Sequence, residues 1–178
     1  MNFKTVDKIN KLSSASETGF EKVSYEQFRS CFLYEVDNRI KGYDDIKLPR
    51  RSTAGSAGYD FFAPYDFTLK PGETIVVPTG IRCNIKNGWF LALFPRSGFG
   101  FKTGYSLSNT VGIIDSDFYH SDNEGHIMVK LENNSPINKT LTVKKGQAFC
   151  QGIFLQYGLI YEDDATGIRN GGFGSTTE

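Results

Sequence analysis

The carboxylate of Asp115 is the group in this sequence that is best placed to do chemistry, because it ends a β-branched run, VGII, at residues 111–114. A carboxylate at the end of a buried strand loses water, so it requires either a partner or a reaction that uses its charge. One such use is general-base catalysis, in which the carboxylate takes a proton from an attacking water. The alternative is a strand that runs out into an acidic surface loop, where Asp117, Asp122 and Glu124 follow.

Four other short segments carry groups that can bind phosphate. Each places Gly, Arg, Ser or Gln at a strand end or turn: AGYDFF at 57–62, PRSG at 95–98, KGQAFCQ at 145–151 and RNGGFGST at 169–176. Arginine offers a planar fork of donors to phosphate oxygens, and glycine lets backbone N–H groups approach an anion. A P-loop is excluded, because no Gly-Lys-Ser/Thr follows the glycines. Taken singly, these segments are more often an ordinary turn, an ion pair or a frayed terminus.

Together with VGIID, the four segments resemble the five motifs of the trimeric, all-β deoxyuridine triphosphatases (dUTPases), in the same order and at approximately the same spacing. The resemblance extends from about Ile46 to the C-terminus. It implies hydrolysis of dUTP to dUMP and pyrophosphate by in-line attack of water on the α-phosphate, with Mg²⁺ held mainly by the phosphates. It also implies a jelly-roll-like β-barrel or sandwich that assembles as a homotrimer with active sites at subunit interfaces.

The same resemblance implies a role for each candidate site residue. Asp115 is the general base, and Asp60 and Gln151 reach the metal through water. Phosphate is bound by Arg96, Ser97, Gly98, Gln151, Arg169, Gly174, Ser175 and Thr176. The uracil and deoxyribose are held by Asn109, Gly112, Ile114, Phe118, Tyr119 and Phe173, of which Phe173 stacks on the uracil ring.

The sequence departs from the family pattern in each of the last three motifs. Phe118 stands where the family usually has Tyr, and a shift of one residue would present Tyr119 to the sugar instead. Ala148 replaces an Arg of the fourth motif, and Phe173 follows Arg169 by four residues where many members have five. The residue that packs on the sugar and the path of the C-terminal arm therefore stay open.

Composition limits the other functions that the protein can have. The charges balance, with 20 Lys and Arg against 20 Asp and Glu, so no global field recruits nucleic acid or an anionic membrane. No apolar run approaches the roughly 20 residues of a membrane span, and the N-terminus lacks a secretory signal pattern. Cys31, Cys83 and Cys150 form no CxxC pair and are expected to be reduced, mostly packed thiols. These features predict a cytoplasmic protein that uses neither nucleic acid nor membrane as a partner.

An N-terminal extension, residues 1–43, precedes the first of the five motifs. Apolar residues at helical spacing predict an amphipathic helix over about 24–41, which begins at a capping box formed by Ser24 and Gln27. Docking of this helix on its own domain or trimer is favoured over binding of another protein.

Residues 44–162 are expected to form the all-β domain that positions the motifs. Short strand-like runs, from IKLP at 46–49 to GLIYE at 158–162, alternate with Gly, Pro and Asn turns. Residues 163–178 have few core formers and are predicted to be a mobile arm that closes the active site. His120 and His126 lack metal-ligand partners at suitable spacing and are assigned to a surface loop.

Two alternative functions stay open. A trimeric dCTP deaminase resembles this sequence in the PRS and ID segments, but its catalytic Glu falls at Lys130, which cannot do that chemistry. A non-enzymatic nucleotide-sensing or protein-binding module on a dUTPase-like scaffold would use the N-terminal helix to bind a protein. Ammonia release from dCTP supports the first alternative, and nucleotide binding without Mg²⁺-dependent turnover supports the second.

Overall fold

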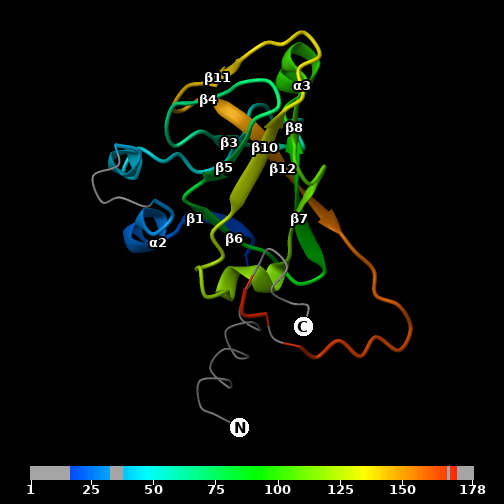
Figure 1. Ribbon diagram of the computed structural model, residues 1–178. Coiled ribbons are helices and arrows are strands. Elements are labelled where there is room, and N and C mark those ends of the chain that lie inside the picture. The colour runs from blue at the N-terminus through cyan, green and yellow to red at the C-terminus, as the bar shows by residue number, and fades with distance from the viewer. Residues whose placement is uncertain (1–16, 33–37, 168, 172–178) are drawn as a thin grey trace.

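Short antiparallel strands form an all-β body, as predicted (Figure 1). The computed structural model describes residues 17–32, 38–167 and 169–171. The largest sheet has the strand order β2 (Arg50–Arg51), β3 (Tyr59–Phe62), β12 (Ala148–Gln156), β7 (Trp89–Pro95) and β9 (Gly112–Ile114). A second sheet has the order β5 (Thr74–Pro78), β10 (Met128–Asn133) and β8 (Tyr105–Leu107). Two strand pairs complete the body: β4 (Phe67–Leu69) with β11 (Leu141–Val143), and β1 (Gly19–Lys22) with β6 (Ile81–Asn84).

The alternation of side chains along these strands produces a hydrophobic core. Buried and less buried residues alternate along β10, β4 and β11, because successive side chains of a strand point to opposite faces. Phe61, Leu91 and Phe149 are almost completely buried within this core. All three cysteines are free, and Cys83 and Cys150 are buried, as predicted. The described helices are all too short or too polar to cross a membrane.

The N-terminal helix is much shorter than predicted. Helix α2 spans only Tyr25–Arg29 and begins at Ser24, whose hydroxyl accepts a hydrogen bond from the Gln27 N–H. The chain turns after Arg29 and next forms the 3₁₀ helix η1 (Ile40–Gly42). Residues 33–37 of the predicted helix lie outside the described part of the chain.

Packing, rather than helical periodicity, places the apolar residues of the extension. Phe28 is fully buried and its ring meets the ring of Phe32, which in turn meets Tyr65 of the body. The guanidinium of Arg39 lies 4.8 Å from the centre of the Phe32 ring. A helix of one or two turns is marginal alone, so tertiary contacts decide where it ends. The prediction of a continuous helix is therefore wrong at residues 30–32, where the chain turns.

His126 does not lie at the surface, so the assignment of this residue to a surface loop is wrong. The side chain is 0% exposed, and its Nε2 accepts a hydrogen bond from the Gly80 N–H at 2.8 Å. Because Nε2 is an acceptor, we assign the ring proton to Nδ1, which lies 3.6 Å from the Cys31 Sγ. Burial lowers the pKa of His126 to about 4, against a weaker opposing effect of Glu124, so the ring is neutral.

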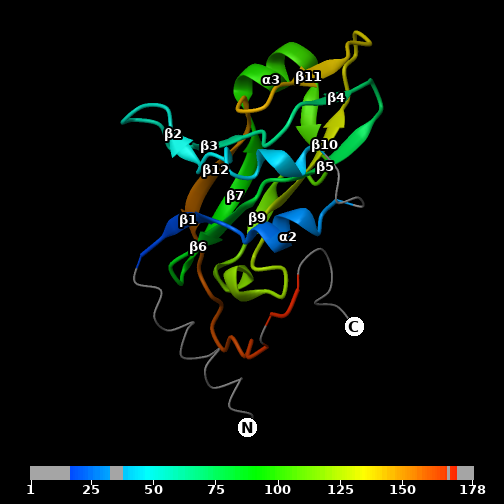
Figure 2. The same cartoon turned by 90° about the vertical axis from the view of Figure 1, so that its left-hand side faces the viewer.

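Four segments of the β domain differ from the sequence-based expectation. PRSG leads into the helix α3 (Ser97–Thr103), and VGIID leads into the 3₁₀ helix η2 (Ser116–His120). IKLP forms no strand, and GLIYE forms none because no described strand pairs with it. After β12 the chain projects from the body and then returns, so that residues 169–171 lie beside η2 (Figures 1 and 2).

Candidate active site

Strand β9 and the turn before it position Asn109 and Asp115, which lie at the two ends of this short segment. Gly112 of β9 lies opposite Leu93 of β7, and a Cβ at Gly112 would lie 3.2 Å from the Leu93 Cβ, so glycine permits close strand packing. The preceding turn contains Thr110, whose φ of +64° is unusual for a β-branched residue. Asn109 therefore lies before the strand and Asp115 immediately after it.

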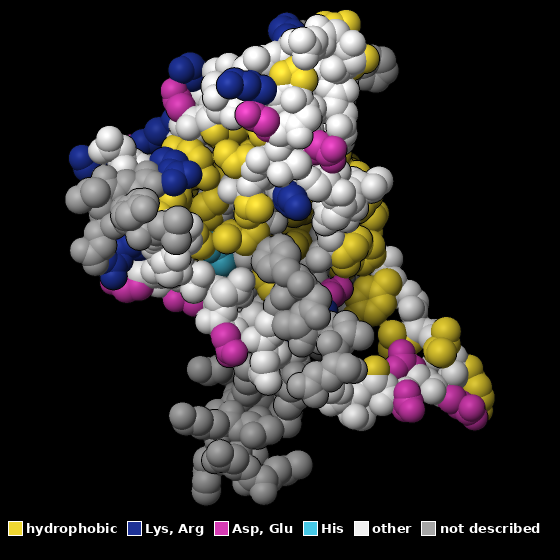
Figure 3. Space-filling model, viewed as in Figure 1, with side chains coloured by type: hydrophobic (Ala, Val, Ile, Leu, Met, Phe, Trp, Pro, Cys, Tyr) yellow, Lys and Arg dark blue, Asp and Glu magenta, His cyan; other side chains and the backbone are white. Residues whose placement is uncertain are grey.

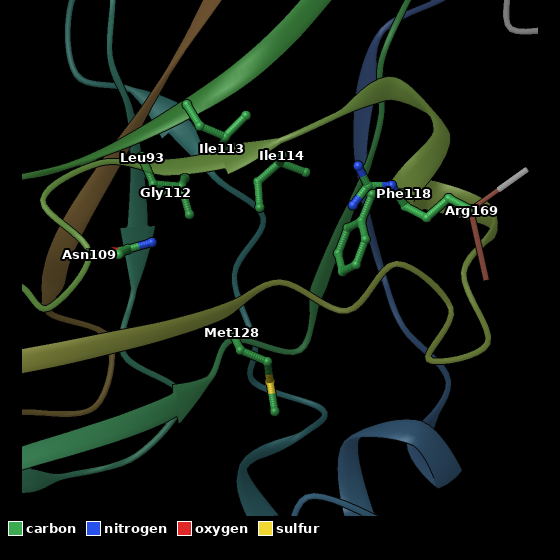
Figure 4. A pocket seen from close by; sticks show the side chains of 8 residues that line it. All are labelled: Leu93, Asn109, Gly112, Ile113, Ile114, Phe118, Met128 and Arg169. Carbon is green, nitrogen blue, oxygen red and sulfur yellow. The ribbon is translucent and has the colours of Figure 1, made fainter. Parts of the chain in front are cut away.

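A pocket of about 210 Å³ lies between β9 and β10 (Figure 4). Asn109 is at one end, and Phe118 and Arg169 are at the other. The remaining lining residues are Leu93, Gly112, Ile113, Ile114 and Met128. The pocket thus brings together the predicted nucleoside-binding residues Asn109, Gly112, Ile114 and Phe118. Apolar walls with a few polar groups are typical of small-molecule sites.

Phe118 and Tyr119 point to different surroundings. Phe118 is 6% exposed and lines the pocket. The Tyr119 hydroxyl instead donates a hydrogen bond of 2.7 Å to Glu21 Oε2 in the N-terminal extension. Phe118, and not Tyr119, is therefore the aromatic residue available to a ligand in this pocket.

Arg169 joins two carboxylates of its own chain at the rim of the pocket. Its Nη2 donates to Asp115 Oδ2 at 2.5 Å and its Nε donates to Asp117 Oδ1 at 2.9 Å. All three side chains are partly exposed, so the cluster is open to solvent. Asp117 was not among the predicted site residues, although its position two residues after the candidate base places it beside the same guanidinium.

A second cluster forms where β3, β12 and β7 meet. Arg96 Nε lies 3.0 Å from Asp60 Oδ1, and the Ser52 hydroxyl donates to Asp60 Oδ2 at 2.9 Å. Gln151 lies opposite Asp60 in the strand register and donates from Nε2 to the Pro95 carbonyl at 3.2 Å. Asp60 therefore forms an ion pair with Arg96, and this pair lies beside Gln151, another predicted phosphate-binding residue.

Small residues leave room for the polar groups of this second cluster. A Cβ at Gly58 would lie 2.5 Å from Gln151 Oε1, so a larger residue would displace the Gln151 amide. Ser97 and Gly98 follow Arg96 directly and begin α3. Ala148, in place of the family's Arg, is buried opposite Phe62 and adds no charge to the cluster.

The two clusters are far apart within one chain. Ile114, the residue before Asp115, pairs with Leu91 in β7, and Arg96 follows five residues later along the same strand direction. At the rise of an extended strand this separation is roughly 17 Å. A base must come within hydrogen-bond reach of the water that it activates. Asp115 and Arg96 of one chain therefore lie towards opposite ends of β7.

The metal contacts and the end of the C-terminal arm are the remaining predicted parts of the site. Among the described residues no three His, Cys, Asp or Glu side chains gather as a metal-binding group. Asp60 is already engaged by Arg96 and Ser52, which suits contact with a metal through water better than direct ligation. The predicted residues Phe173, Gly174, Ser175 and Thr176 lie outside the described residues.

The sequence of this chain was compared with those of known proteins. The dUTPase family model matches residues 44–177. A deoxyuridine 5'-triphosphate nucleotidohydrolase from Lactococcus lactis subsp. lactis (strain IL1403) is 38% identical, covering 80% of this chain and 95% of the relative. The same enzyme from Shewanella sp. (strain MR-7) is 40% identical, covering 78% and 91%.

Solved structures show the same fold. The crystal structure of dUTPase from Streptococcus mutans matches with a TM-score of 0.62 and 32% identity, covering 80% of this chain and 98% of that one. The native dUTPase of EIAV matches with a TM-score of 0.57 and 19% identity, covering 85% and 100%. The predicted jelly-roll-like, all-β class is confirmed by these structural matches. The chain belongs to the dUTPase family.

Proposed function

We propose that the protein hydrolyses dUTP to dUMP and pyrophosphate, with Asp115 as the general base. The observation that carries this proposal is a carboxylate at the rim of a nucleoside-sized pocket, in a chain whose family match spans residues 44–177. The pocket of about 210 Å³ is smaller than the roughly 300 to 1,000 Å³ of pockets that enclose a whole drug-sized ligand. It suits a base and sugar, and leaves the triphosphate to groups outside it.

The pocket walls account for the choice of nucleotide. We assign recognition of uracil to the Asn109 amide and to the backbone of Gly112 and Ile114, which offer donors and acceptors along the β9 edge. Phe118 packs on the deoxyribose and presents no polar partner to a ribose hydroxyl. A hydroxyl buried against this ring loses its water without replacement, which disfavours UTP.

Hydrolysis requires a positioned water and neutralisation of charge at the phosphates. The Asp115 carboxylate orients the water and takes its proton, while Arg96, Ser97, Gly98 and Gln151 hold the phosphates. In this assignment the triphosphate draws Arg169 away from Asp115 and Asp117, which frees the base. Gly174, Ser175 and Thr176 extend the same phosphate contacts, and Phe173 covers the uracil.

Mg²⁺ is the proposed cofactor. Asp60 and Gln151 would hold it through its water shell, because neighbouring carboxylates dense enough for an all-protein cage are lacking among the described residues. When bound, the cation neutralises phosphate charge that develops during cleavage. The three free thiols fit a reducing compartment, and we place the protein in the cytoplasm.

We further infer that the protein is a homotrimer with shared active sites. The separation of roughly 17 Å along β7 between the level of Ile114 and Arg96 supports a second chain that completes each site. An exposed apolar run, Leu159, Ile160 and Tyr161, lies on the segment that projects from the body (Figure 3). These side chains are 72%, 80% and 90% exposed in one chain, and a second copy would cover them. In this arrangement residues 44–162 form the catalytic domain and residues 163–178 form the arm that closes the active site.

Pyrophosphate release with Mg²⁺ from dUTP, dTTP, dCTP and UTP tests the proposed reaction. We expect selective dUTP turnover that falls by about two to four orders of magnitude in Asp115→Asn, since the amide cannot accept the proton. Asp66→Asn, which alters a distant exposed ion pair with Lys144, is the matched control and should retain full activity. A folded wild type without dUTP turnover would refute the reaction, and full activity of Asp115→Asn would refute the assignment of the base.

A further inference from the structure

We propose that Glu21 and Ser24 of the N-terminal extension are positioning residues for the reaction, because they fix the segment that follows Asp115. This inference rests on the proposed function. The family match begins at residue 44, so neither residue lies within the matched region. Both nevertheless contact residues 119–124, directly after the candidate base and Phe118.

The first contact is a three-residue cluster around the Glu21 carboxylate. Strand β1 pairs with β6 so that Glu21 lies opposite Arg82, which donates to Glu21 Oε2 from Nη2 at 2.7 Å and from Nε at 3.1 Å. The Tyr119 hydroxyl donates to the same oxygen at 2.7 Å. The Arg82 guanidinium also lies 4.4 Å from the centre of the Tyr119 ring. Tyr119 is therefore held both at its hydroxyl and across its ring face.

The charge of Glu21 supports this cluster. The hydrogen bond from Tyr119, followed by the contribution of Arg82, lowers the pKa of Glu21 despite partial burial. At neutral pH the carboxylate is therefore ionised and accepts charge-assisted hydrogen bonds.

The second contact joins Ser24 to Glu124, at the end of the same segment. Ser24 donates from its backbone N–H to Glu124 Oε2 at 2.7 Å and from its hydroxyl to Oε1 at 2.6 Å. Glu124 has a φ of +57° and its N–H donates to the Ser121 carbonyl, so the carboxylate projects from a tight turn. Ser24 is also the N-cap of α2, and Val23 and Phe28 beside it are buried in the core. The part of the extension from β1 to α2 therefore supports this turn through packed residues.

Phe118 couples these contacts to the pocket. Tyr119 faces the extension while its neighbour Phe118 lines the pocket, so fixing one side chain fixes the backbone that carries the other. Asp115 caps the same 3₁₀ helix, η2, and the Phe118 N–H donates to its carbonyl at 3.2 Å. A shift of η2 would consequently displace both the base and the wall of the pocket.

Kinetics of Glu21→Ala, Tyr119→Phe and the double variant test this inference. We expect each single variant to lower kcat/KM for dUTP by about three- to tenfold, through both kcat and KM, at an unchanged thermal midpoint. The kcat/KM of the double variant should fall no further than that of the more impaired single variant, because both changes remove one interaction. Asp66→Asn serves as the control for loss of a surface ion pair and should leave kcat/KM unchanged.

Amide hydrogen exchange separates this inference from the proposed function. In both single variants the amides of residues 116–125 should exchange faster, while those of β12 should not change. Unchanged exchange and unchanged kcat/KM would overturn the positioning role, and multiplicative losses would show that Tyr119 acts independently of Glu21. If the wild type fails to hydrolyse dUTP, the proposed function fails, and the exchange result alone decides whether the contacts fix the segment.

Discussion

At the scale of single residues, Arg169 controls access to the proposed base. Its two donors bridge Asp115 and Asp117, so the Asp115 Oδ2 accepts a hydrogen bond from the guanidinium. A planar guanidinium can exchange carboxylate oxygens for phosphate oxygens without losing its fork geometry. In the proposed reaction, this exchange would link substrate binding to release of the base.

Buried His126 should make the protein less stable in acid. Its pKa of about 4 lies below the ordinary value of about 6.5, because burial disfavours the charged ring. Between these two pH values the unfolded chain binds a proton that the folded chain does not, so stability falls as pH falls through this window. The full loss is at most about 3 kcal/mol.

Denaturant unfolding of the wild type, His126→Gln and His120→Gln between pH 7 and about pH 4 measures this effect. Gln can still accept the Gly80 N–H but does not titrate, so the slope of stability against pH should be shallower in His126→Gln. His120→Gln should keep more of the wild-type slope. Equal slopes in the wild type and His126→Gln would contradict a neutral, buried His126.

At the scale of elements, the turn that ends at Gly125 should be the most sensitive part of the site to added volume. A Cβ at Gly125 would lie 2.7 Å from the Tyr119 Cα and 2.8 Å from the Phe118 carbonyl oxygen, both of them backbone atoms. Gly88 has a similar positive φ, +83° against +69°, but its Cβ would meet nothing within 4 Å. The two glycines therefore separate backbone strain from steric displacement.

We expect Gly88→Ala to lose about 1 to 2 kcal/mol from its left-handed backbone alone. Gly125→Ala should lose more stability and should also raise KM for dUTP, because the backbone of Phe118 must move. Thermal unfolding and steady-state kinetics of the two variants measure the difference. Equal stabilities and equal KM values would show that the turn tolerates the added methyl group.

The strands were more predictable from sequence than the helices, for a physical reason. The alternation along β10 and β11 reports local geometry that the core enforces at every second residue. The apolar spacing from Tyr25 onward matched a helix, but it did not reveal that Phe32 meets Tyr65, far away in sequence, after the chain has turned. His126 was misassigned for the same reason, because its satisfying donor, Gly80, is also distant in sequence.

At the scale of the whole molecule, the motifs identified candidate residues but not the separation of these residues into two clusters. Asp60, Arg96 and Gln151 meet as a cluster, whereas Asp115 lies with the pocket at the other end of β7. Motif order contains no information about this division, since it follows from strand register. The run GLIYE has strand-like composition without a described partner strand, which also points to another chain.

Complementation between two inactive variants tests the shared site most directly. Asp115→Asn removes the base, and Ser97→Ala removes a hydroxyl of the phosphate cluster. If each site takes Asp115 from one chain and Ser97 from another, random co-assembly restores both residues in about a quarter of the sites. As the control, wild type co-expressed with the Asp115→Asn, Ser97→Ala double variant should also retain intact residues in about a quarter of the sites, against about half if each chain forms its own site.

The measurement is pyrophosphate release from dUTP by the unselected mixture of co-assembled trimers, in which a different affinity tag on each variant verifies that mixed trimers are present. We predict that the mixture recovers about a quarter of wild-type activity while each parent variant stays strongly impaired. Mixed trimers that recover no activity would contradict an active site built from Asp115 of one chain and the Arg96 cluster of another.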